Sequence, residues 1–159
     1  MVVVEGALDA FVVRVVDGEA EGRRRHAVRA GRGALVVGMP PADVARADGD
    51  GVNVVIHEFA HKLDMLNGDA NGYPPLHAGM SRQAWAGAFE TAYADFCRRV
   101  DAGEETAIDP YASESPAEFF AVMSEAFFEI PLEVKRDYAA IYDQLKLFYK
   151  QDPATRMAM

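Results

Sequence analysis

The sequence predicts an α+β fold, with a small β-rich region before a longer, mainly helical part. Three short runs rich in β-branched residues fall at 2–4, 11–16 and 34–37, separated by glycines and charged residues. From residue 51 onward the apolar residues recur at helical spacing instead. A chain of 159 residues, half of them hydrophobic, suits one globular domain. We therefore expect a single domain over residues 1–159, β-rich at 1–50 and helical at 51–153.

Four helices are expected in the second part, each bounded by residue types that start or stop helices. Serine precedes the second and third helices, proline takes the first position of the third, and glycine follows the first. The expected boundaries are residue 67 for the end of the first helix, 81–100 for the second, 115–129 for the third, and 131–151 for the fourth. Residues 68–80 are expected to form a loop, and the last six residues to be loose.

The first of these helices carries the motif H-E-x-x-H at residues 57–61. Positions four apart share one face of a helix, so His57 and His61 point the same way, one turn apart. Two neutral imidazoles at that spacing can share one Zn²⁺. Glu58 leans away from this face, towards the open coordination position, where it can take a proton from a water. This arrangement is typical of metallopeptidases.

The alternative interpretation is that both histidines are satisfied inside a helical core. Val55, Phe59 and Leu63 form an apolar stripe away from the histidines, as a buried helix requires. Against it, the chain holds only four histidines and two of them fall in this motif. His77 lies in the expected loop, where a histidine is more often exposed than a ligand, and it is not counted.

A third metal ligand is needed, and the residues alone leave it open. Asp64 lies on the histidine face, but it is seven residues from His57, roughly 10 Å along a helix, which is too far. The third helix offers Glu118, Glu125 and Glu129 for a set of two histidines and one glutamate. Glu118 and Glu125 are seven apart and share a face. Glu118 could instead reach back to its own helix start as a capping box, and Glu125 could be a surface acid.

Charge and cysteine content exclude several classes of protein. Residues 1–50 carry 7 basic and 8 acidic side chains, whereas the rest carries 9 and 17. Such an acidic second part disfavours nucleic acid as a substrate, because phosphates would be repelled. The single cysteine, Cys97, excludes an internal disulfide and suits a reducing compartment. No apolar run is long enough to cross a membrane, and the first residues lack the features of a signal peptide. A cytoplasmic protein is expected.

Several motifs together resemble one known family. They are residues 53–64 (NVVIHEFAHKLD), 72–76 (GYPPL), 109–112 (DPYA), 115–122 (SPAEFFAV) and 124–129 (SEAFFE). In order and spacing they closely resemble the Mlc titration factor A family of zinc-dependent peptidases, over residues 51–153. The order of tyrosine and then glutamate is similar to that in the peptidase domain of anthrax lethal factor.

The resemblance implies a zincin-like metallopeptidase domain with one Zn²⁺ per chain. It implies His57, His61 and Glu118 as zinc ligands, Glu58 as the general base, and Tyr111 as the residue that stabilises the transition state. Family members are cytoplasmic and show aminopeptidase-like activity on small substrates. The best-known member binds and titrates the glucose-system repressor Mlc. Members generally carry a longer, helical N-terminal part, which this chain is expected to lack.

Two functions follow as expectations. In the first, the chain hydrolyses peptide bonds, with an activated water, Glu58 as base and the Tyr111 hydroxyl on the oxyanion. In the second, it is a non-catalytic binding module that sequesters a transcriptional regulator. An intact Glu58 favours the enzyme, because a purely structural metal site does not need this carboxylate.

Overall fold

The computed structural model describes residues 2–5, 12–15, 34–36 and 53–157. In the last of these ranges the chain forms the helices α1 (Val54–Asp64), α2 (Arg82–Asp101), α3 (Pro116–Glu129), α4 (Pro131–Asp137), α5 (Ala139–Tyr149) and α6 (Pro153–Met157), with short 3₁₀ turns η1 (Met65–Asn67) and η2 (Pro110–Ser113). The strands β1 (Val2–Glu5), β2 (Val12–Val15) and β3 (Ala34–Val36) pair antiparallel with one another in the order β2-β1-β3.

The expected α+β class is wrong for the part of the chain that holds the core. Over residues 53–157 every regular element is helical, and 71% of these residues lie in helices. The buried core residues that the structure describes all come from this range, and they lie on helices or on the turns between them. β-branched runs report a local preference, and the preference does not tell whether a sheet packs against the helices.

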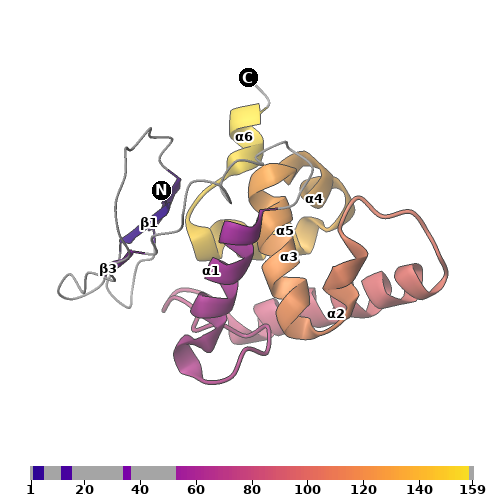
Figure 1. Cartoon of the computed structure of the whole chain (residues 1–159), viewed down its shortest axis with the longest axis horizontal. Coiled ribbons are helices and arrows are strands. Elements are labelled where there is room, and N and C mark those ends of the chain that lie inside the picture. The colour runs from indigo at the N-terminus through magenta and orange to yellow at the C-terminus, as the bar shows by residue number, and fades with distance from the viewer. Residues whose placement is uncertain (1, 6–11, 16–33, 37–52, 158–159) are drawn as a thin grey trace.

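Helix α3 is the centre of the helical part (Figure 1). It packs against α1, α2, α4, α5 and η2, and ten of its fourteen residues are buried. A helix that is apolar on nearly all sides belongs in the middle of a core. Aromatic rings fill the space around it: Trp85 stacks on Phe89, and both make edge contacts with Phe120.

The starts of α2 and α3 agree with the sequence predictions, and α1 begins with a cap of the same kind. The side chains of Asn53, Ser81 and Ser115 each accept a backbone N–H at the start of α1, α2 and α3. These caps satisfy amide groups that the first helical turn leaves without partners. The first helix ends at Asp64, three residues early, and continues as η1 up to Gly68, whose φ is positive at 143°.

The expected fourth helix is two helices, α4 and α5, with a break at Tyr138. Tyr138 turns its ring towards Phe96, and its hydroxyl accepts a hydrogen bond from Arg99, both on α2. This tertiary contact overrides the uninterrupted helical pattern of the sequence.

The expected loose C-terminus is also wrong for residues 154–157, which form most of α6. Asp152, just before α6, accepts hydrogen bonds from the Tyr142 hydroxyl and the Lys146 ammonium, both on α5. The N–H of Ala154 in turn bonds to the Tyr142 oxygen. Within the described residues, no helix is both long enough and apolar enough to span a bilayer.

Gly72 provides a test of how the loop after α1 is packed. Its φ is +81°, and a Cβ there would lie 2.6 Å from the carbonyl oxygen of Pro116. We predict that Gly72→Ala lowers the free energy of unfolding by roughly 1–3 kcal/mol, from strain and this clash. Urea denaturation measures the loss.

Gly79→Ala is the matched control, since it lies in the same loop with open space around a Cβ and no positive φ. It should leave the stability within about 1 kcal/mol of the parent or raise it. Equal stabilities of the two variants would show that the Gly72 contact is not a constraint.

Candidate metal centre

The site is built where α1 and α3 lie side by side (Figure 1). The Asn53 cap fixes the start of α1, so that His57 and His61 follow on one face, one turn apart. Glu118 stands in the first turn of α3, opposite them. The motif residues predicted from the sequence are therefore brought together from two helices that are far apart along the chain.

Three donor atoms converge between these helices. The Nε2 atoms of His57 and His61 lie 3.1 Å apart. Oε2 of Glu118 lies 3.0 Å from the first and 3.3 Å from the second. Four ligands placed tetrahedrally around Zn²⁺ at about 2.0–2.1 Å are about 3.3 Å from one another. The donor set and its spacing therefore fit a small divalent ion with one coordination position left open.

The arrangement decides between the two interpretations of Glu118. Its backbone N–H bonds to Oγ of Ser115 at 3.2 Å, so serine caps the helix as the sequence predicts. Its carboxylate does not return to the helix start and lies against the histidines instead. The cap and the contact with the histidines are compatible, because one uses the backbone of Glu118 and the other its side chain.

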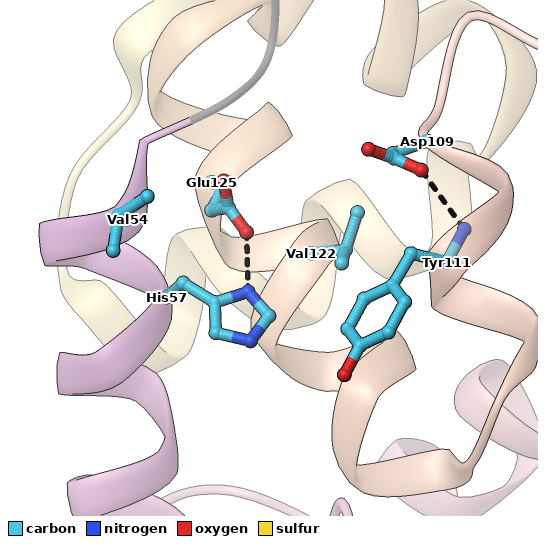
Figure 2. Close-up of a pocket in the computed structure, with 6 residues that line it drawn as sticks. All are labelled: Val54, His57, Asp109, Tyr111, Val122 and Glu125. Carbon is cyan, nitrogen blue, oxygen red and sulfur yellow. Dashed lines mark hydrogen bonds and ion pairs between the residues drawn. The ribbon is translucent and has the colours of Figure 1, made fainter.

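Glu125 lies two helical turns after Glu118 on α3, and it orients His57. Its Oε1 is 2.5 Å from Nδ1 of His57 (Figure 2). Its Oε2 accepts the backbone N–H of Asn53 at 2.5 Å. A proton on Nδ1 leaves the lone pair of Nε2 facing His61 and Glu118, which is the tautomer that a metal ligand needs. Only 4% of Glu125 is exposed, so its two hydrogen bonds replace the water that burial removes.

This contact also changes the acidity of His57. The hydrogen bond to Glu125 raises the pKa of His57 above its usual value, and the nearby carboxylate charges act in the same direction. Burial of the imidazole opposes the rise in pKa but is the smaller effect.

Glu58, the expected general base, is exposed on α1 directly after His57. One residue corresponds to about 100° of helix rotation, so its side chain starts off the face that carries the donor atoms. It is therefore not part of the converging set.

Tyr111, the expected transition-state residue, lies on η2 across the site. The carboxylate of Asp109 accepts the backbone N–H of Tyr111 and holds this turn. The Tyr111 ring centroid is 6.2 Å from that of His57, and the side chain is 51% exposed. In Figure 2 both rings lie below Val122, with His57 on α1 to the left and Tyr111 to the right. The three residues line one cavity of about 190 Å³. The charge of Glu118 is the main cause that raises the pKa of Tyr111.

Asp64 and His77 have structural positions outside the donor set. Oδ2 of Asp64 accepts the N–H groups of Asn71 and Gly72, at 2.8 and 2.7 Å, so this residue caps the neighbouring loop. His77 is buried, and its Nε2 donates to the carbonyl of Phe148 at 2.7 Å. The expectation of an exposed histidine was wrong, although His77 is no ligand.

Sequence reasoning missed the roles of Glu125 and Asn53. Glu125 was considered only as a ligand or a surface acid, and Asn53 was not considered. The seven-residue spacing from Glu118 was the available signal, because it places both carboxylates on the face of α3 that meets α1. Glu129 extends the same row and accepts a hydrogen bond from the Asn53 side chain at 2.9 Å.

Comparison with known proteins agrees with this site. Residues 9–150 match the family described as Glucose-regulated metallo-peptidase M90. An uncharacterized protein of Synechocystis sp. is 38% identical over 125 residues, 79% of this chain and 45% of that protein. Two proteins named Mlc titration factor A match over 113 residues, which is 69% of this chain. The one from Serratia proteamaculans is 42% identical, and the match covers 43% of its length. The one from Yersinia pestis is 41% identical, and the match covers 42% of its length. The chain spans less than half the length of these relatives.

These matches confirm the family expected from the motifs, whereas the likeness to anthrax lethal factor stays a prediction.

The contact between Glu125 and His57 predicts a pH dependence in the metal-free protein. Because the folded-state pKa of His57 is raised, protonated His57 stabilises the fold fully below its unfolded pKa of about 6.5. This stabilisation is lost as the pH rises through the folded-state pKa. Glu125→Gln should lower the pKa of His57, measured by NMR titration of the imidazole in the presence of a chelator.

Glu129→Gln is the matched control, since Glu129 contacts Asn53 and is not a cause of the His57 shift. It should leave the pKa of His57 unchanged. An unchanged pKa in Glu125→Gln would mean that this carboxylate does not set the acidity of His57.

Proposed function

Because this chain belongs to the M90 family of glucose-regulated metallopeptidases, we propose that it is a zinc-dependent peptidase of the aminopeptidase type. Residues 51–153 form the catalytic region. The observation that carries the proposal is the triangle of two imidazole nitrogens and one carboxylate oxygen, with edges of 3.0–3.3 Å. The family makes the chain metallopeptidase-like, and the identity of the ion and the roles of single residues are our proposal.

Zinc is the ion that suits this donor set best. Two histidines and a glutamate, with a fourth position open to solvent, form a recurring catalytic zinc site. Oxygen-only sites would favour magnesium or calcium instead. When bound, Zn²⁺ would supply Lewis acidity that polarises the scissile carbonyl and lowers the pKa of a coordinated water.

The residues around the ion have separate roles in this proposal. His57, His61 and Glu118 hold the metal, and Glu125 keeps His57 in the right tautomer. Glu58, exposed beside them, accepts a proton from the attacking water and passes it to the leaving amine. Tyr111 stands across the cavity and donates its hydroxyl to the carbonyl oxygen as negative charge develops there. The hydroxyl carries its proton at neutral pH, and the nearby charge of Glu118 raises its pKa further.

A second candidate function is suggested by the name of the relatives, Mlc titration factor A. In it, this chain binds an Mlc-like transcriptional repressor and removes it by mass action. The two functions are separable, because binding a repressor does not require Glu58. Co-purification with such a repressor, unchanged in the Glu58→Gln variant, would support this second function.

Metal content tests the ligand set. We predict that Glu118→Ala loses most of its zinc, measured by elemental analysis of the purified protein. Glu125→Ala should bind zinc roughly 10–100-fold more weakly than the parent, which is typical for a residue that orients a ligand. Glu114→Ala, which removes an exposed acid near the start of α3, is the control and should retain the metal. Full zinc in Glu118→Ala would remove this glutamate from the ligand set.

Turnover tests the general base. Glu58→Gln keeps the size of the side chain but cannot accept a proton. We predict that it retains zinc and loses roughly 10²–10⁴-fold in kcat on a chromogenic aminoacyl substrate. Full activity with zinc bound would rule out Glu58 as the base.

Tyr111→Phe tests the oxyanion donor. We predict a smaller fall in kcat than for Glu58→Gln, with zinc content unchanged, because the metal still stabilises the oxyanion. The substrate and metal assays are the same. If both variants and the parent are equally inactive with a full metal site, the repressor-binding function replaces the peptidase.

A further inference from the structure

A second pocket lies between the loop after α1, helix α2 and the start of α3. It has a volume of about 60 Å³, room for a compact group. Four aromatic rings line it, from Tyr73, Phe89, Tyr93 and Phe119. Phe89 and Phe119 are buried and meet edge to face, with centroids 6.1 Å apart, whereas the two tyrosines are partly exposed.

One charged group lines the same pocket. Oε1 of Glu90, on α2, accepts the hydroxyl of Tyr73 at 2.6 Å. Its second oxygen, Oε2, has no hydrogen-bond or ion-pair partner among the residues that the structure describes. This hydrogen bond raises the pKa of Tyr73 to about 12, so the hydroxyl keeps its proton and remains the donor to Glu90. Aromatic faces and a carboxylate both attract a cation, and an ammonium satisfies both at once.

The pocket is joined to the catalytic residues through the backbone. Pro116, in its wall, precedes Glu118 by two residues on α3. The hydroxyl of Tyr93 donates to the carbonyl of Ser113 at 2.9 Å, and Ser113 follows Tyr111 on η2. The pocket and the donor set therefore share the start of α3, where Pro116 and Glu118 are two residues apart.

We infer that this aromatic pocket binds the ammonium group of a lysine side chain in the peptide substrate. The inference rests on the proposed peptidase function, whose substrate it narrows. A lysine side chain fits both parts of the surface, since its methylenes can lie on the rings while its ammonium meets Glu90. The excess of acidic residues after residue 50, with 17 against 9 basic, attracts basic peptides to this region.

Direct binding tests the pocket without any turnover. The probe is n-butylammonium, which copies the end of a lysine side chain, and n-butanol is its neutral counterpart. The NMR signals of the Tyr73 and Tyr93 rings should shift saturably with the amine and not with the alcohol. In Glu90→Gln the affinity should fall about tenfold or more, because a hydrogen bond between charged groups is lost.

Asp95→Asn is the matched control. It removes the same charge from the same helix, but Asp95 pairs with Arg98 on the surface and does not line the pocket. It should bind the amine like the parent. Equal binding of amine and alcohol, or equal losses in both variants, would overturn the ammonium pocket.

Peptide binding then identifies the source of the ammonium. Calorimetry measures the affinity of the zinc-loaded Glu58→Gln variant for two N-acetylated peptides. The peptides are identical except that one has lysine where the other has norleucine. The lysine peptide should bind about tenfold more tightly, and Glu90→Gln, added to this variant, should remove the difference. Equal affinities of the two peptides would overturn the inference.

The two proposals fail differently. If the parent cleaves no peptide but the lysine preference depends on Glu90, the peptidase function fails and the lysine pocket stands. If the parent cleaves lysine and norleucine peptides with equal kcat/KM, the pocket fails and the peptidase stands.

Discussion

The buried carboxylate of Glu125 connects the two helices that make the site. It accepts hydrogen bonds from the His57 ring and from the backbone at Asn53, so one side chain of α3 fixes both the start of α1 and the first motif histidine. A carboxylate this deeply buried is stable only while its partners remain, and removing one partner of such a pair commonly costs about 3–5 kcal/mol. The position of α1 on α3, and with it the convergence of the donor atoms, depends on this contact.

Local signals in the sequence predicted much of the helical part. Ser81 and Ser115 marked the starts of α2 and α3, and the period of the motif placed His57 and His61 on one face. These features depend on neighbours along the chain, which the sequence displays directly. The family motifs added Glu118 and Tyr111, which no spacing rule could have chosen.

The failures share one cause, which is contact between distant segments. Tyr138 interrupts a continuous helical pattern because its ring packs against Phe96 and its hydroxyl bonds to Arg99, both on α2. Asp152 and Tyr142 order a terminus that composition alone marks as loose. Glu118 and Glu125 are equivalent by helical spacing, and only the position of α1 along α3 determines which one faces the Nε2 atoms of both histidines. The α+β prediction failed similarly, because strand propensity does not reveal whether a sheet joins the core.

The central position of α3 has a consequence for the order in which the protein opens. Amide hydrogens in a helix buried on nearly all sides exchange with solvent only when the whole domain unfolds, whereas peripheral helices can open alone. Glu118 and Glu125 therefore belong to the slowest-exchanging unit of the helical part. The histidines belong to α1, which has one buried neighbour in α3 and an exposed opposite side. The candidate ligands thus come from two units of different stability. Local unfolding of α1 separates the histidines from Glu118 while α3 and the core stay folded, and this gives a metal ion a route in and out.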